Sequence, residues 1–174
     1  MLKSNEGVLL CMDLFILRHG KAEKSSDDTP DAARALTREG KEEVQRVARW
    51  MKGNKIRFDA IATSPLKRAR GTAKIIATVL GQENRLTLWD ELAPGGDQDT
   101  VCYNASHYGE KATVLIVGHE PALSLLISSI IGGDGNGAVI LTKSGLAKIQ
   151  NYTFARRPAG RLVWLLTPDI IPDR

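Results

Sequence analysis

The feature that most constrains the fold is an apolar stretch at residues 13–17, which ends in Arg18, His19 and Gly20. The last four residues of the stretch are apolar, which is typical of a parallel strand that is covered on both faces. Charged residues and a glycine then follow where the strand should leave the sheet. Because ligands bind at the carboxyl ends of strands in open α/β sheets, this tripeptide is a candidate functional site.

These three residues carry groups suited to phosphate chemistry. Arg18 offers a planar fork of donors for an oxyanion, and His19 can be neutral and nucleophilic near neutral pH. Gly20 allows a sharp turn and a close approach of the backbone to a ligand. We therefore predict that His19 attacks a phosphoryl group held by Arg18. The alternative is a hydrogen-bonded structural histidine at the end of a strand.

A second apolar strand is predicted at residues 112–117, and His119 follows it in the same position that His19 has after the first. Residues 122–131 then form a predicted helix that is apolar nearly all round, which indicates a buried helix. The amino end of this helix carries partial positive charge beside His119, which favours a bound anion.

Other helices are marked by residues that typically start them. Thr37 is a predicted N-cap, and Ser64 with Pro65 predicts a second helix with serine as its cap. Arg68 falls in the first turn of that second helix. A third helix is predicted after Asp97.

Strands alternate with helices over most of the chain, which predicts a three-layer α/β/α fold with a mostly parallel central sheet. Further strands are predicted at residues 58–63, 86–89, 146–154 and 161–167. The carboxyl ends of the strands then bring together Arg18, His19, Arg68 and His119.

Composition fits one globular domain and narrows its partners. The 174 residues are 43% hydrophobic and 25% charged. Residues 12–174 are therefore predicted to form one domain, after an N-terminal extension at 1–11 that is poorly ordered or extends the first strand. The net charge of +4 favours an anionic substrate, and 5% aromatic residues leave little for base stacking, so no nucleic acid is expected. Cys11 and Cys102 do not have the spacing of a metal or redox site, which predicts a cytoplasmic protein. No apolar run reaches the length of a membrane span, so no membrane partner is expected.

Four motifs then resemble a known family, in the family's order. They are Leu17-Arg18-His19-Gly20, Leu36-Thr37-Arg38-Glu39-Gly40, the run from Thr63 to Ala73, and Val117-Gly118-His119-Glu120-Pro121. In this order they resemble the histidine phosphatase superfamily, which has the phosphoglycerate-mutase-like fold, and within it the SixA-type phosphohistidine phosphatases. The resemblance runs from about Met12 to near the end of the chain. Gly71 departs from the pattern, because glutamine is usual at that place.

The resemblance implies a mechanism and a set of site residues. His19 is expected to form a covalent phosphohistidine that water hydrolyses, with Arg18, Arg68, His119 and Gly20 binding the substrate. His119 is expected to carry a proton and to donate it in a hydrogen bond to a phosphoryl oxygen. The two arginines supply the positive charge that phosphoryl transfer requires, so no metal or other cofactor is expected. Phosphate and vanadate are expected to bind in the same pocket.

The general acid is less well marked. Related phosphatases and mutases use a carboxylic acid to protonate the leaving group, and Glu91 is at the matching place in the chain. The alternative is that Asp90 and Glu91 are solvated carboxylates of a loop. Arg70 is not carried over from the family motif and is expected at the rim or surface.

Three functions remain open from the sequence. The first is a phosphatase for phosphohistidine in a partner protein, and the second is a phosphatase or mutase for small phosphoesters with the same catalytic core. The third is a non-catalytic module that binds anions. At 174 residues the chain has no large insertion to enclose a small metabolite, which favours a side chain presented by another protein. The substrate, the pathway and the oligomeric state stay open.

Overall fold

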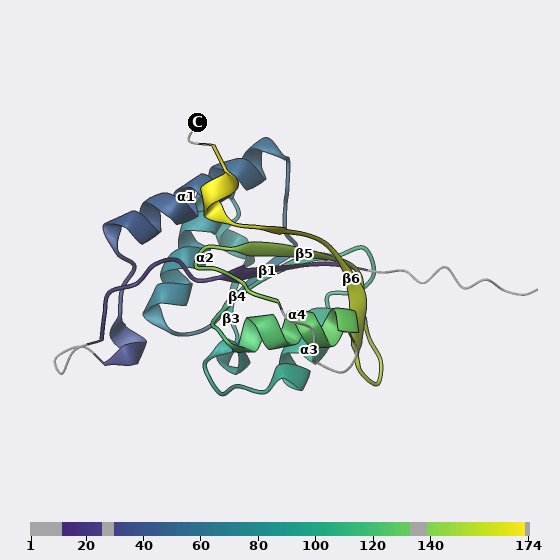
Figure 1. Cartoon of the computed structure of the whole chain (residues 1–174). Coiled ribbons are helices and arrows are strands. Elements are labelled where there is room, and N and C mark those ends of the chain that lie inside the picture. The colour runs from purple at the N-terminus through teal and green to yellow at the C-terminus, as the bar shows by residue number, and fades with distance from the viewer. Residues whose placement is uncertain (1–11, 26–29, 133–138, 173–174) are drawn as a thin grey trace, which may run out of the picture.

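A six-stranded sheet lies between two layers of helices (Figure 1). The computed structural model describes residues 12–25, 30–132 and 139–172. The expectation for residues 1–11 lies outside this part of the chain. Helices α1 (Arg38–Gly53) and α2 (Lys67–Leu80) cover one face of the sheet, and α3 (Gln98–Ser106) and α4 (Ala122–Gly132) cover the other. The predicted three-layer α/β/α fold is confirmed.

The sheet has the order β3-β2-β4-β1-β5-β6 and is parallel over its first four strands. Its strands are β1 (Met12–Arg18), β2 (Ala60–Thr63), β3 (Leu86–Leu88), β4 (Thr113–Gly118), β5 (Leu146–Phe154) and β6 (Pro158–Leu166). Strand β5 runs antiparallel to β1, and β6 runs antiparallel to β5. In the β1–β4 register Arg18 is paired with Gly118, so the residues that follow these two strands leave the sheet side by side.

Strand β1 is buried on both faces, as its apolar run predicts. Leu14 and Ile16 pack into the core beneath α3 and α4, whereas Phe15 and Leu17 pack into the core beneath α1 and α2. Side chains alternate across a strand, so four consecutive apolar residues supply both cores. This burial holds the end of β1 rigidly at the middle of the sheet.

The helix starts confirm two predictions and correct a third. The side chain of Thr37 accepts a hydrogen bond from the Gly40 amide, and that of Asp97 caps α3 in the same way. Ser64, in contrast, is not the cap of α2, which begins three residues later after Leu66. The Ser64 hydroxyl instead accepts a hydrogen bond from the Leu66 amide at 3.3 Å, before the first residue of α2.

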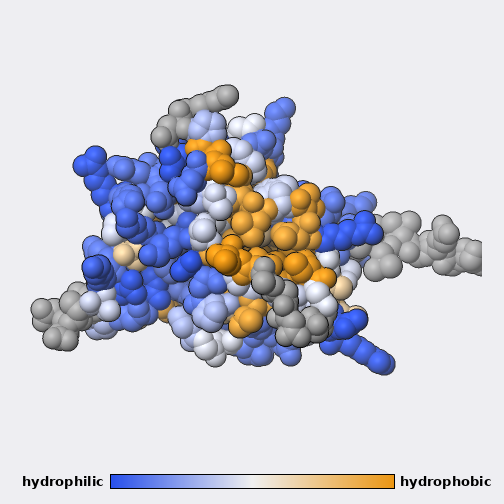
Figure 2. All heavy atoms as spheres, in the orientation of Figure 1, coloured by the Kyte–Doolittle hydropathy of each residue, from blue (hydrophilic) through white to orange (hydrophobic). Residues whose placement is uncertain are grey.

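Helix α4 is not buried on all sides, contrary to the sequence prediction. Leu125 is 49% exposed, and Val163 on β6 is exposed to the same extent. Figure 2 shows hydrophobic residues gathered over α4 and β6, whereas hydrophilic residues cover the side that carries α1. Packing against the sheet covers only one face of the helix, so the apolar residues on its outer face are exposed to solvent. In the described ranges, no helix has both the length and the apolar character needed to cross a bilayer.

Candidate active site

The two histidines meet at the carboxyl ends of β1 and β4. The rings of His19 and His119 have centroids 4.9 Å apart, and both residues are less than a tenth exposed. The His19 amide donates to the Gly118 carbonyl at 3.1 Å, which continues the pairing of the two strands past their ends. Arg68 reaches the same place from the first turn of α2, and its Nε donates to His19 Nε2 at 3.3 Å. The predicted cluster is therefore brought together as expected.

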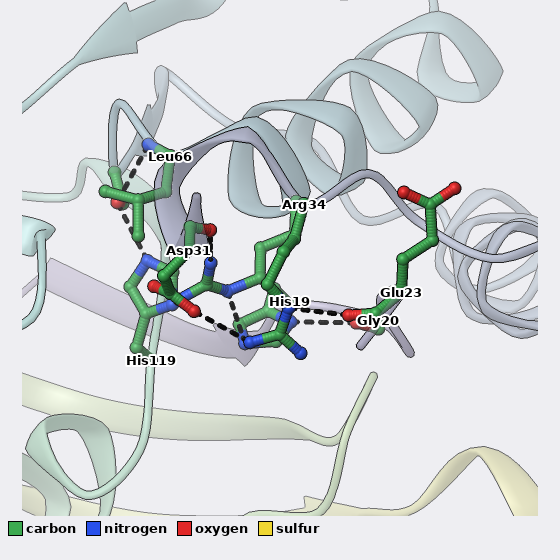
Figure 3. Close-up of polar contacts among 9 residues, drawn as sticks. His19, Gly20, Glu23, Asp31, Arg34, Leu66 and His119 are labelled. Atoms are coloured by element: carbon green, nitrogen blue, oxygen red, sulfur yellow. Dashed lines mark hydrogen bonds and ion pairs between the residues drawn. The ribbon is translucent and has the colours of Figure 1, made fainter. Parts of the chain in front are cut away.

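The ring of His19 is held in one tautomer. Its Nδ1 lies 2.8 Å from the Gly20 carbonyl oxygen, which can only accept a hydrogen bond, so Nδ1 carries the hydrogen. In the neutral ring Nε2 then has a free lone pair, directed at the Arg68 guanidinium (Figure 3). An unprotonated ring nitrogen thus faces a guanidinium, an arrangement suited to phosphoryl chemistry.

Burial keeps both histidines neutral. The pKa of His19 is lowered to about 4, mainly by burial and in smaller part by the charges of Arg68, Arg18 and Lys143, whereas the hydrogen bond to Gly20 opposes the shift. Burial likewise lowers the pKa of His119 to about 3. His119 is therefore neutral in the free protein, and its expected donation to a phosphoryl oxygen stays a prediction. A neutral imidazole still has one N–H to donate.

His119 has one nitrogen anchored and one unpaired. Its Nε2 lies 2.8 Å from the Ser64 hydroxyl, which also accepts a hydrogen bond from the Leu66 amide. The Ser64 hydroxyl can therefore donate to Nε2, which leaves the hydrogen of His119 on Nδ1. This Nδ1 is buried without a hydrogen-bond partner among the described residues, and Figure 3 shows it turned toward His19. Unpaired buried donors cost free energy and are typical of functional sites.

Arg18 is the second residue of the cluster with an unpaired nitrogen. One end of its guanidinium donates to the Leu141 carbonyl at 3.0 Å, whereas its Nε is buried without a partner in the described part of the chain. Burial lowers the pKa of Arg18, and the nearby charge of Glu120 opposes that shift. The hydrogen bond to Leu141 fixes the Arg18 guanidinium, and its unpaired Nε is left as a donor for an anion.

Asp31 and Arg34 are site residues that the sequence did not single out. Asp31 lies in a short 3-10 helix, where its carboxylate and its carbonyl accept hydrogen bonds from Arg68 at 3.0 and 2.7 Å. The same carboxylate accepts from Arg34 at 2.7 Å, and these bonds lower the pKa of Asp31. The only signal in the sequence is the polar and charged composition of residues 22–35. Asp31 orients the Arg68 fork so that Nε points at His19.

Gly20 supports the site more than it lines it. Its carbonyl fixes the His19 tautomer, and its amide donates to Thr72 Oγ1 at 3.0 Å. A Cβ at this position would lie 2.7 Å from a methyl group of Val44 on α1, so only glycine fits. Direct contact of Gly20 with a substrate stays a prediction.

Glu91 lies beside His119, in the short 3-10 helix Asp90–Leu92. Both residues line one small pocket, together with Gln98 and Gly96. Arg70 is exposed, as expected. No group of three or more histidine, cysteine or acidic side chains in the described ranges is arranged to hold a metal ion.

The low pKa of His19 can be measured directly. We expect ¹⁵N NMR to show an unprotonated Nε2 at pH 7 and a midpoint near pH 4, because burial disfavours the charged ring. The lone pair is therefore available above about pH 4 and is lost as the pH falls through that value. The midpoint should stay well below 6.5 in Arg68→Ala, since burial is the larger cause. A wild-type midpoint near 6.5 would contradict this assignment.

Comparisons with known proteins agree with this geometry. The family described as "Histidine phosphatase superfamily (branch 1)" matches residues 14–94. Phosphohistidine phosphatase SixA of Escherichia coli (strain K12) is 30% identical over 159 residues, which cover 90% of this chain and 94% of that protein. A SixA homolog of Haemophilus influenzae (strain ATCC 51907 / DSM 11121 / KW20 / Rd) is 29% identical and covers 70% of this chain and 78% of its own.

A solved structure shares the fold over nearly its whole length. The structure of the protein histidine phosphatase SixA complexed with tungstate superimposes with a TM-score of 0.78 at 28% identity, covering 91% of this chain and 98% of that one. The common fold is the phosphoglycerate-mutase-like fold. The chain therefore belongs to the histidine phosphatase superfamily, and its relatives identify it as a phosphatase.

Proposed function

We propose that the protein is a metal-independent phosphatase that removes the phosphoryl group from phosphohistidine in a partner protein. The observation that carries the proposal is the fixed tautomer of His19, with its Nε2 lone pair directed at the Arg68 guanidinium. The names of the SixA relatives support phosphohistidine as the substrate. The tungstate named for the SixA structure supports the binding of a phosphate-like anion.

The reaction has two displacements at phosphorus. In the first, His19 Nε2 forms a bond to phosphorus while the P–N bond of the substrate breaks, and the leaving imidazole takes up a proton from water, which is returned to solvent when the attacking water loses a proton in the second. In the second, water attacks the phosphohistidine at His19, which releases inorganic phosphate and restores the neutral ring. Each step balances without a further reactant.

Positive charge and hydrogen-bond donors stabilise the transferring group. Arg18 and Arg68 provide charge-assisted hydrogen bonds to its oxygens, and the unpaired Nδ1 of His119 is directed at the same volume. Phosphoryl transfer depends mainly on such positioning and charge. Two arginines thus do what a divalent cation does in many other phosphoryl-transfer enzymes.

A side-by-side assay tests the proposal. Free phosphohistidine, a phosphohistidine peptide and phosphoserine are supplied to the same enzyme in excess EDTA. We expect turnover of both phosphohistidine substrates at a rate well above that of phosphoserine, and competitive inhibition by vanadate. Loss of activity in EDTA that a divalent ion restores would refute the metal-free mechanism. A preference for phosphoserine would refute the assignment of the substrate.

Glu91 favours a second candidate function, the hydrolysis of small phosphoesters. An alkoxide leaving group needs a proton more than a protonated imidazole does, and Glu91 lines a pocket with His119. We expect Glu91→Gln to lower phosphoester hydrolysis far more than phosphohistidine hydrolysis, measured as kcat/KM on the two substrates. Equal losses would make Glu91 a general acid for both substrates and favour the phosphoester reading. No loss on either substrate would assign Glu91 to the solvated loop.

A further inference from the structure

The outer side of α2 carries an unpaired row of positive charge, which we call the basic face. It consists of Lys67, Arg70 and Lys74, which are all exposed. Their spacing of three and four residues places them on one side of the helix. No carboxylate in the part of the chain that the structure describes lies within salt-bridge distance of them.

A groove runs along the basic face. Besides the three cations, it is lined by Ala32, Thr63 and Pro65, by Gly71 and Glu83, and by Leu86 to Leu88 of β3. Ala32 follows Asp31, which holds Arg68, whereas Thr63 and Pro65 flank Ser64, which contacts His119. Three residues of the groove are therefore neighbours in the chain of residues that hold Arg68 and His119.

Gly71 keeps the middle of the basic face open. It lines this groove and a second one between α1 and α2, and Lys67 and Lys74 also line both. A glutamine is usual at this place in the family motif, whereas a Cβ here would lie 3.3 Å from Leu36 Cδ1. Gly71 thus adds no side chain to the lining of either groove.

The positive charges in the first turn of α2 do not stabilise the helix. The first turn of α2 contains Lys67, Arg68 and Arg70 and no acidic residue, and its N-cap Leu66 makes no side-chain hydrogen bond. Positive side chains at the amino end of a helix oppose its dipole. Arg68 is explained by the active site, whereas Lys67 and Arg70 have no structural partner that would explain them.

We propose that the basic face binds an acidic segment of the phosphorylated protein, next to the phosphohistidine that enters the site. The inference rests on the proposed function and adds to it the charge of the partner. The row of three cations is complementary to carboxylates, and Glu83 is the only acidic residue that lines the groove among those described. Neither groove has an aromatic residue in its described lining, so a stacking platform for nucleic acid bases is missing from this surface.

Two synthetic peptides test the proposal. Both carry a central phosphohistidine, and its flanking residues are glutamates in one and serines in the other. At low salt we expect wild type to have a KM about tenfold lower for the acidic peptide at similar kcat, because each exposed charge pair contributes a few-fold. About 1 M salt should remove the difference, since the Debye length then falls to about 3 Å.

Substitutions locate the effect on the basic face. The triple variant Lys67→Gln/Arg70→Gln/Lys74→Gln should lose the preference through KM, with unchanged turnover of free phosphohistidine. The control Lys52→Gln/Arg156→Gln/Arg157→Gln removes the same charge from exposed positions elsewhere and should keep the preference. Glu83→Gln should increase the preference, which gives a second test that does not depend on a loss.

The outcomes separate the two proposals. Equal KM values for both peptides with active enzyme would overturn the docking inference alone. The docking inference would also be overturned if the control triple variant lost the preference for the acidic peptide as strongly as the basic-face variant. It would be overturned as well if a single-stranded oligonucleotide bound wild type but not the basic-face variant, while wild type did not distinguish the two peptides. Turnover of neither peptide nor of free phosphohistidine would overturn the proposed function together with this inference.

Discussion

Replacing His19 with alanine removes phosphatase turnover and the covalent phosphoenzyme while the fold is kept. We expect a loss of at least about 10⁴-fold, as found when an enzyme loses its nucleophile. The cost in stability should be roughly 1–2 kcal/mol, because the ring makes few hydrogen bonds and sits at the end of a strand. Steady-state kinetics, circular dichroism and thermal unfolding measure the two effects.

The phosphoenzyme must be trapped under alkaline conditions, because the P–N bond of phosphohistidine is labile in acid. The chain has three histidines, and the exposed His107 gives a matched control. His107→Ala should keep the label and the activity, whereas His19→Ala should lose both. Normal turnover in a folded His19→Ala protein would end the covalent mechanism.

Replacing Arg68 with alanine should lower kcat/KM for free phosphohistidine by about 10²–10³-fold. Loss of one preorganised donor in other enzymes costs about 2.7–4 kcal/mol of transition-state stabilisation. Arg68 is 5% exposed and has its Nε directed at His19, so solvent cannot easily replace it. Vanadate should also bind more weakly to the variant, as measured by inhibition.

Two substitutions separate the geometry of Arg68 from its charge. Arg68→Lys keeps the charge but loses the fork held by Asp31, and it should restore only part of the activity. Arg70→Ala removes an equal charge two residues further along α2 and should leave turnover of free phosphohistidine unchanged. Equal losses in Arg68→Ala and Arg70→Ala would show a general effect of net charge in place of a specific contact.

The sequence by itself determined the elements whose signals are local. The apolar run of β1 identified a strand with both faces buried, and the side chains of Thr37 and Asp97 marked helix starts through bonds to amides within three residues. Such bonds form within one turn of the chain, so a short stretch contains all the information. The same apolar run placed Arg18 and His19 at the end of that strand, where ligands bind in a parallel sheet.

Tertiary structure decided the features that depend on a choice between local and distant partners. Ser64 had the type and spacing of a helix cap, yet its hydroxyl binds His119, which is 55 positions away. Asp31 is one of several acidic residues in a polar stretch, and only the approach of α2 selects it as the partner of Arg68. A hydroxyl or a carboxylate has many acceptable partners, and packing determines which one is within reach.

The protonation of the histidines also came from the tertiary structure. The sequence predicted a free lone pair on His19 and a proton on His119, and burial lowers the pKa of both rings and leaves both neutral with one N–H each. The exposure of Leu125 on α4 was missed for a related reason, because an all-apolar helix does not show which side meets the sheet. Residue type sets what a group can do, but the free energy of its charged or apolar state depends on how much water the folded chain excludes around it.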